Sequence, residues 1–92
     1  METSYDEKKR KLTLENRGLD FADAGKIFAG LTLTVEDDRT DYGEVRYQTI
    51  GRLVRSTLMV VWTPRGKARH IISMRKCNDR EKERYRASLG GL

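Results

Sequence analysis

The sequence predicts one α+β domain in which two N-terminal helices precede a four-stranded antiparallel sheet and a C-terminal helix. Two periodicities predict this fold: apolar residues recur at helical spacing before residue 30 and alternate with a period of two after it. Short links between the predicted elements favour antiparallel neighbours. With 92 residues the chain is long enough for one modest core, so residues 1–92 are expected to form a single domain.

The two N-terminal helices are predicted from their spacing and their end signals. The first covers residues 5–16 and has a weak apolar stripe. Gly18 follows it, and glycine readily adopts the left-handed conformation that ends many helices. The second runs from about residue 21 to 29, with Asp20 in front as a good N-cap. Both helices are expected to lie on the same face of the sheet.

The four predicted strands cover residues 31–36, 45–53, 56–63 and 68–74. The third is apolar on both faces, which is typical of a central strand. After the fourth strand, Asn78 can cap a final helix, and Glu81 stands at the position that returns the cap's hydrogen bond. With the helices packed on one face, the other face of the sheet is expected to be open.

Charge is distributed unevenly along the chain. The net charge is +5, but residues 1–37 carry six Lys and Arg against eight Asp and Glu, whereas residues 38–92 carry thirteen against six. The first segment therefore has a net charge of −2 and the second of +7. Such asymmetry predicts that the C-terminal half meets a polyanion or an acidic protein surface.

Several classes of protein are excluded by composition. The single cysteine, Cys77, cannot form an internal disulfide, and together with the single histidine, His70, it does not make a zinc site. No apolar stretch approaches the roughly 20 residues of a membrane span, and the charged N-terminus is not a signal peptide. We therefore expect a cytoplasmic protein without metal, cofactor or membrane contact.

The chemistry-bearing side chains gather where the fourth strand meets the final helix, in the stretch RHIISMRKCNDREKERY. Arg75 at the strand end can hold a scissile phosphate and offset transition-state charge, or it can simply form a salt bridge with Glu81 or Glu83. His70 titrates near neutrality and is a candidate general base; the alternative is a strand residue without chemistry. Tyr85 can stack on a base or donate its hydroxyl, or it can pack against the sheet.

A second group of cations and aromatic residues occupies the loop and strand DDRTDYGEVRYQTIG. Glu44 is a candidate base and Arg46 a candidate phosphate clamp, but a solvated hairpin loop has the same composition. Aromatic rings interleaved with arginines suit single-stranded nucleic acid, because rings stack on bases while cations follow the backbone. The predicted RNA-binding residues are Arg46, Tyr47, Arg69, Lys76, Arg80 and Arg84.

The chain resembles the BrnT family of bacterial toxins over about residues 12–86. The matching pieces include Gly43-Glu44 followed by Arg46-Tyr47, and the run Ile71–Lys76 followed by Arg80-Glu81; the others are Gly18, Phe21-Ala22-Asp23-Ala24, Phe28, Asp38-Arg39, Ile50-Gly51, Leu58–Val61, Thr63 and Tyr85. Two positions depart from the family pattern: Arg17 stands where histidine is usual, and His70 where arginine is usual.

The resemblance implies a RelE-like fold and a metal-independent endoribonuclease that blocks translation and growth. It also implies a partner, a BrnA-like antitoxin with a ribbon-helix-helix domain, in a tight heteromeric complex that binds operator DNA. We assign Arg75 to transition-state charge, His70 to proton transfer, and Glu81 to orienting Arg75 or capping the helix. Tyr85 is expected to contact the substrate or to donate a hydrogen bond. A non-catalytic basic module that binds RNA or DNA is the alternative function. Exposed apolar strand residues, Ile71 and Met74, are expected beneath the antitoxin.

Overall fold

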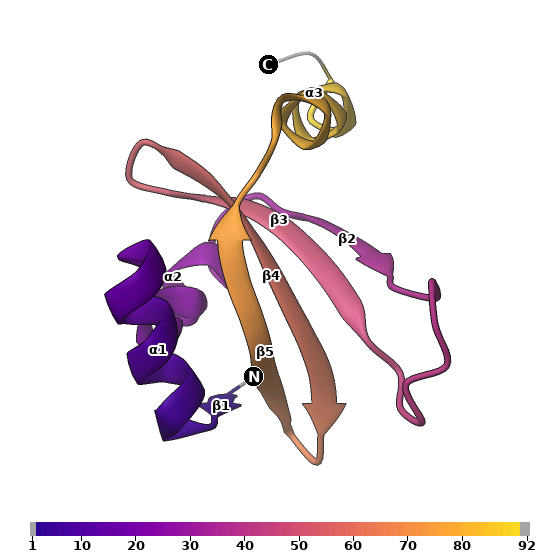
Figure 1. Ribbon diagram of the computed structural model, residues 1–92. Helices are drawn as coiled ribbons and strands as arrows, with labels where there is room; N and C mark the ends of the chain where they lie inside the picture. Colours follow the sequence, from indigo (N-terminus) through magenta and orange to yellow (C-terminus); the bar gives the residue numbers. More distant parts are fainter. Residues whose placement is uncertain (1, 91–92) are drawn as a thin grey trace.

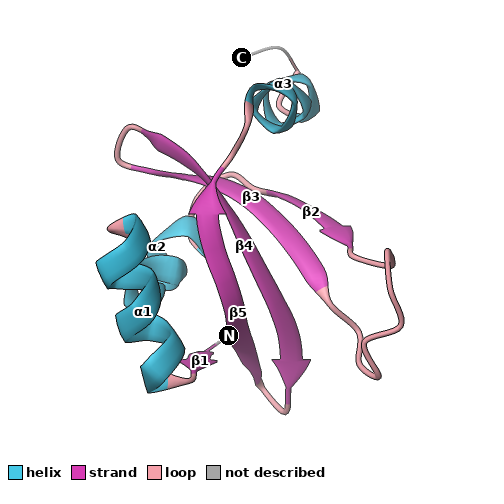
Figure 2. Cartoon of the chain, in the orientation of Figure 1, coloured by secondary structure: helices cyan, strands magenta, loops and turns pink. Residues whose placement is uncertain are grey.

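The computed structural model describes residues 2–90 and shows an α+β domain built on one sheet (Figure 1). Within these residues one short strand comes before the N-terminal helices, four strands follow them, and one helix comes last (Figure 2). Their order is β1 (Glu2–Tyr5), α1 (Glu7–Arg17), the 3-10 turn η1 (Phe21–Asp23), α2 (Ala24–Phe28), β2 (Leu33–Glu36), β3 (Tyr47–Leu53), β4 (Ser56–Arg65), β5 (Ala68–Lys76) and α3 (Asp79–Ser88).

The sheet has five strands in the order β1-β5-β4-β3-β2, and it is mixed. Strands β2 to β5 pair antiparallel, as predicted, but β1 pairs parallel with β5. The prediction of a four-stranded, purely antiparallel sheet is therefore wrong. Strand β1 has only four residues and no apolar alternation, so its position depends on pairing with the otherwise open edge of β5.

The first helix begins later than predicted, because Tyr5 belongs to β1. Asp6 caps α1 by accepting a hydrogen bond of 2.8 Å from the Lys8 amide. Gly18 ends it with φ 69°, which confirms the predicted stop. The predicted helix over residues 21–29 is divided into η1 and the short α2.

The main core lies between the sheet and the N-terminal helices, which stand on the left in Figure 1. Ile71 and Met74 of β5 are both fully buried in it, although three residues separate them. A register shift opposite Val61 and Trp62 inserts one extra residue in β5 and turns both side chains to the same face. The expectation that Ile71 and Met74 are exposed is therefore wrong.

Helix α2 lies close against β3 at Gly51. A Cβ atom on Gly51 would stand 2.6 Å from Cγ2 of Ile27, so this position admits no side chain. The close approach brings α2 onto the sheet and buries Ile27 completely.

Helix α3 packs on the opposite face, at the end of the sheet where β5 finishes (Figure 1). Tyr85 contacts a second, smaller apolar cluster formed with Ile50, Met59 and Cys77. The prediction that all helices share one face is therefore wrong, but the part of this second face that α3 leaves uncovered agrees with the expected open surface. No helix of the described residues is long and apolar enough to cross a membrane.

Candidate active site

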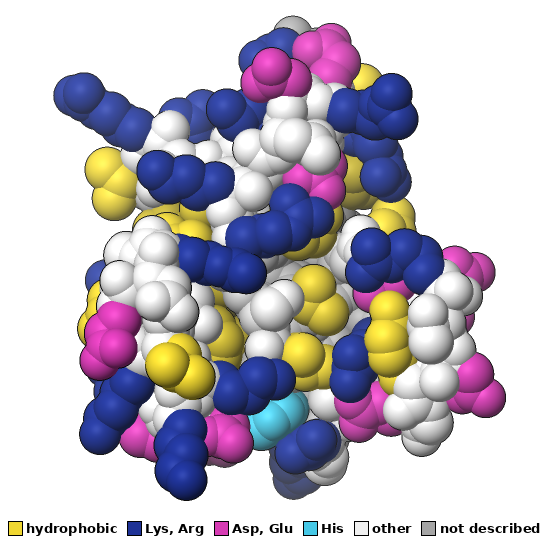
Figure 3. All heavy atoms as spheres, in the orientation of Figure 1, with side chains coloured by type: hydrophobic (Ala, Val, Ile, Leu, Met, Phe, Trp, Pro, Cys, Tyr) yellow, Lys and Arg dark blue, Asp and Glu magenta, His cyan; other side chains and the backbone are white. Residues whose placement is uncertain are grey.

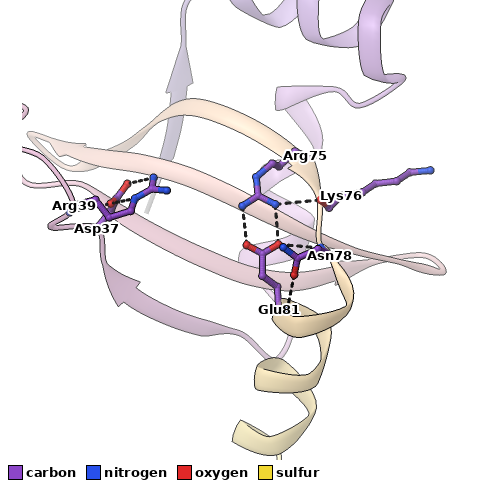
Figure 4. A network of polar contacts seen from close by, with 6 residues as sticks. All are labelled: Asp37, Arg39, Arg75, Lys76, Asn78 and Glu81. Carbon is purple, nitrogen blue, oxygen red and sulfur yellow. Dashed lines mark hydrogen bonds and ion pairs between the residues drawn. The ribbon is translucent and has the colours of Figure 1, made fainter.

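The second face of the sheet carries an arginine that a glutamate from α3 holds in place. Arg75 lies opposite Met59 in the β4–β5 register, and its side chain points to the face that α3 partly covers. Its Nη1 and Nη2 donate hydrogen bonds of 2.8 and 2.7 Å to the two carboxylate oxygens of Glu81 (Figure 4). Parallel bonds of this kind fix the plane of the guanidinium as well as its position.

The predicted capping box at the start of α3 places Glu81. The side chain of Asn78 accepts a hydrogen bond of 2.8 Å from the backbone N–H of Glu81. The carboxylate of Glu81 accepts one of 2.9 Å from the backbone N–H of Asn78. The hydrogen bonds from Arg75 lower the pKa of Glu81 to about 2, against the opposing effect of burial. The same contact raises the pKa of Arg75, so the pair stays ionised at neutral pH. Glu81 is thus a fixed anion that orients Arg75.

Arg75 keeps part of its hydrogen-bonding capacity free. A guanidinium has five N–H donors. Two serve Glu81, and one makes a longer contact of 3.3 Å with the Lys76 carbonyl. The side chain is 39% exposed, so the remaining donors are open to a ligand. This arrangement suits a phosphate, whose oxygens can accept two parallel bonds.

A second arginine held by a carboxylate lies on the same face. Arg39 donates hydrogen bonds of 2.7 and 2.9 Å to Asp37, whose side chain is only 1% exposed. These bonds lower the pKa of Asp37 to about 2. The charge of Arg39 acts on Arg75, and Figure 4 shows the two groups on the same side of the sheet. Sequence reasoning gave Arg39 no role; the Asp-x-Arg spacing after β2 was the available signal.

His70 lies toward the other end of β5. It stands five positions before Arg75, which is about 15 Å along a strand. Its Nδ1 shares a hydrogen bond of 2.9 Å with the hydroxyl of Ser4 on β1. Burial, followed by the charge of Arg65, lowers its pKa, so the imidazole is neutral at pH 7. The fold does not bring His70 into contact with the Arg75–Glu81 pair.

A comparison with known families gives the family of the chain. The sequence pattern described as "Ribonuclease toxin, BrnT, of type II toxin-antitoxin system" matches residues 5–81, which is most of the chain. The chain belongs to the BrnT family. Its relatives by this description are ribonuclease toxins of type II toxin–antitoxin systems, which have RNA as substrate and an antitoxin as partner. A search of curated proteins finds no match.

In this BrnT chain, Tyr85 occupies a packing position. Its side chain is 7% exposed, and its hydroxyl donates a hydrogen bond of 2.7 Å to the Leu31 carbonyl. Both the ring and the hydroxyl are therefore engaged within the fold, which favours the packing alternative for this residue.

The predicted RNA-binding residues are divided between the ends and faces of the BrnT sheet. Lys76, Arg80 and Arg84 are exposed at the same end as Arg75. Tyr47 lies on the helix-covered face, with its ring centroid 4.9 Å from that of Trp62. These residues do not form one continuous site.

Two predicted RNA-binding arginines rest on aromatic rings. Arg69 lies over Phe28 on the helix-covered face, with its guanidinium carbon 4.1 Å from the ring centroid, and its Nε is buried without a hydrogen-bond partner. Arg46 lies 4.1 Å above the ring of Tyr42 and forms an ion pair of 3.1 Å with Glu44. The contacts of Arg46 lie within its own loop and do not reach Arg75.

Metal ligands do not gather anywhere in residues 2–90. No group of three or more His, Cys, Asp and Glu side chains in this part of the chain is placed to hold a metal ion. The electrostatic character of the face comes from its cations, and Figure 3 shows Lys and Arg side chains around a centre of uncharged and hydrophobic groups.

Proposed function

We propose that this BrnT chain cleaves RNA internally, with the ribose 2′-hydroxyl as nucleophile and Arg75 as the cation that stabilises the transition state. The observation that carries the proposal is the Arg75–Glu81 pair: a guanidinium held in a fixed plane, with donors free, on an open cationic face. Preorganised donors aimed at developing charge supply a large share of the rate enhancement in enzymes.

The reaction needs no nucleophile from the protein. The 2′-oxygen forms a bond to phosphorus while the bond from phosphorus to the 5′-oxygen breaks, which leaves a 2′,3′-cyclic phosphate and a 5′-hydroxyl. A base receives the 2′-hydroxyl proton, and an acid gives one to the departing oxygen. Negative charge builds up on the phosphate oxygens, where Arg75 donates and Arg39 contributes a second positive charge from across the face.

Glu81 acts as a positioning residue. Both of its oxygens accept hydrogen bonds from Arg75, and its low pKa makes it a weak base. His70 is the proton carrier in our proposal, because its lowered pKa keeps it neutral and able to accept a proton at pH 7. Because about 15 Å of strand separates His70 from Arg75, the reacting phosphodiester must lie between the two side chains, with its phosphate toward Arg75 and its 2′-hydroxyl toward His70. Tyr85 has a structural role.

The antitoxin in this proposal is a BrnA-like ribbon-helix-helix dimer. It binds the toxin in a tight heteromeric complex that also binds operator DNA, within the cytoplasm. A stable interface buries roughly 600–1,000 Å² on each partner. The toxin exposes 6108 Å², so such an interface would cover a substantial share of its surface. The RelE-like fold and the arrest of translation and growth belong to the same proposal.

The decisive experiment incubates the purified protein with end-labelled RNA in excess EDTA. We expect fragments that carry a cyclic phosphate, and growth arrest when the protein is expressed alone. Intact RNA with unchanged growth would reject the enzyme, and intact RNA that still binds would favour the non-catalytic module. Co-expression with the neighbouring reading frame tests the antitoxin, since a tight complex elutes as one species in size-exclusion chromatography.

A further inference from the structure

A cationic cleft lies between α3 and the hairpin that joins β3 to β4. Its volume is about 370 Å³, within the range of ligand sites. Four of the seven residues that line it are cations and none is an acid: the lining residues are Arg52, Arg55, Ser56, Thr57, Lys76, Cys77 and Lys82. We call this site the hairpin cleft.

The cations of the hairpin cleft are not neutralised by the fold. Arg10, Arg39, Arg46 and Arg75 each form an ion pair of 3.1 Å or shorter with a carboxylate. None of the four cleft cations forms an ion pair with another residue in the described part of the chain. Like charges repel when they gather without counter-charges, and a polyanion that binds among them removes that repulsion.

The hairpin itself is held in an unfavourable conformation beside the cleft. Val54 has φ 56°, a left-handed value that is a real outlier for a β-branched residue, and its side chain is 87% exposed. Arg55 follows Val54 within this turn, and Arg52 lies near the end of the β3 arm. Strained backbone that buries nothing points to a function for the turn.

A smaller, more apolar hollow of about 240 Å³ continues the cleft along α3. It shares Arg52, Thr57 and Lys82 with the hairpin cleft and adds Leu31 and Leu89. Cations next to an apolar floor suit a nucleotide, since a phosphate binds the cations while a sugar or base covers the apolar part.

The cleft also adjoins the proposed catalytic arginine. Cys77 lines the cleft and packs with Met59, the residue opposite Arg75 in the sheet, and Lys76, which also lines it, follows Arg75 at the end of β5. We propose that the hairpin cleft binds backbone phosphates of the RNA that flank the phosphate held by Arg75. This proposal rests on RNA as the substrate, but it does not require that the protein cleaves RNA by the route given above.

The test measures binding of a single-stranded RNA whose 2′-hydroxyls are all methylated, so that it cannot be cleaved by 2′-hydroxyl attack. The variant is Arg52→Gln with Arg55→Gln. The matched control is Lys8→Gln with Lys11→Gln, which removes the same charge from exposed positions on α1 that form no described ion pair. Thermal unfolding of each variant verifies that it is folded.

The readout is the dependence of affinity on salt concentration. Each lost contact to a single-stranded phosphate reduces the slope of log K against log salt by about 0.7, so we expect a reduction of about 1.4 in the cleft variant. Affinity at 0.1 M salt should fall on the order of tenfold. The control should keep the wild-type slope.

An unchanged slope in the cleft variant would overturn the proposal, and so would an equal reduction in the control. Loss of antitoxin binding with an unchanged RNA slope would also overturn it, because the cleft would then be a docking site for an acidic protein. Because the probe cannot be cleaved, this binding result does not depend on catalysis. If the wild-type protein fails to cleave ordinary RNA but the cleft variant shows the reduced slope, the cleft is supported and the nuclease mechanism is rejected.

Discussion

Glu81 holds Arg75 through two parallel hydrogen bonds of 2.7 and 2.8 Å, from a helix that begins three residues after β5 ends. The short link means that the strand end and the helix start cannot separate, and the capping box fixes the helix start in turn. The arginine is therefore preorganised by covalent and hydrogen-bonded connections within a few residues. This arrangement explains why cations are dense at the strand–helix junction. One of them is fixed by a carboxylate, and others remain open to a polyanion.

Replacing Arg75 should abolish most of the cleavage. We expect Arg75→Ala to lower the single-turnover rate about 100- to 1,000-fold, because it removes a preorganised donor. Arg75→Lys should also be strongly impaired, since an ammonium cannot make the two parallel bonds. Lys11→Ala on α1 is the control. A folded Arg75→Ala protein with full activity and toxicity would show that Arg75 has no catalytic role.

Acid should weaken the fold through Glu81 and Asp37. Both have pKa values lowered to about 2, so each contributes stability that is present above its unfolded pKa and lost as the pH falls toward 2. The lowered pKa of His70 also makes the free energy of unfolding fall as the pH drops from about 7, because the unfolded chain then binds a proton that the folded imidazole does not. Below about pH 5, urea unfolding should show the further decline caused by Glu81 and Asp37. Glu81→Gln should reduce that decline by roughly 1–2 kcal/mol, a value discounted because Arg75 is partly exposed. A variant with the wild-type pH profile would exclude this contribution.

The cleavage rate should fall at acid pH as His70 becomes protonated, and this fall is the acid limb of the pH–rate profile. Because its pKa is lowered, the limb should lie below the ordinary value of about 6.5, with full activity at neutral pH. His70→Gln should slow cleavage about 100-fold or more and remove the limb. His70→Arg separates the two possible roles, since arginine retains a positive charge but cannot accept the proton. Full activity of His70→Arg would assign phosphate binding to this position.

Tyr85→Phe should affect stability and leave chemistry intact. The change removes the hydroxyl that donates to the Leu31 carbonyl, and we expect the free energy of unfolding to fall by about 1–3 kcal/mol. The cleavage rate of the folded variant should stay within about twofold of the wild type. A large loss of rate at unchanged stability would instead place Tyr85 in the catalytic site.

Local features of this chain could be read from the sequence because their causes are local. The stop at Gly18 depends on the conformational freedom of one residue. The capping box of Asn78 and Glu81 depends on two residues that are three positions apart. The four predicted strands follow from alternation, or for the third strand from a continuous apolar run, within each segment. The ion pair of Arg75 was predicted with Glu81 or Glu83 for the same reason, since both glutamates lie within eight positions of it, and the structure shows Glu81.

The tertiary structure decided the features that join distant segments. Strand β1 has no clear pattern of its own, and it exists because the edge of β5 offers unpaired backbone groups. The extra residue in β5 reverses which side chains face the core, and so buries both Ile71 and Met74. Arg39 and Arg75 lie on the same side of the sheet although 36 positions separate them in the chain (Figure 4).

The sequence by itself thus determined the α+β class, the stop of α1 at Gly18, the start of α3 at Asn78 and the cationic strand–helix junction, all of which depend on neighbouring residues. It did not determine the face on which α3 packs, the position of Tyr85, or the gathering of Arg52, Arg55, Lys76 and Lys82 in one cleft. Those depend on how the sheet twists and which strands pair. Such contacts form between residues far apart in the chain, where local spacing carries no information about which side chains meet.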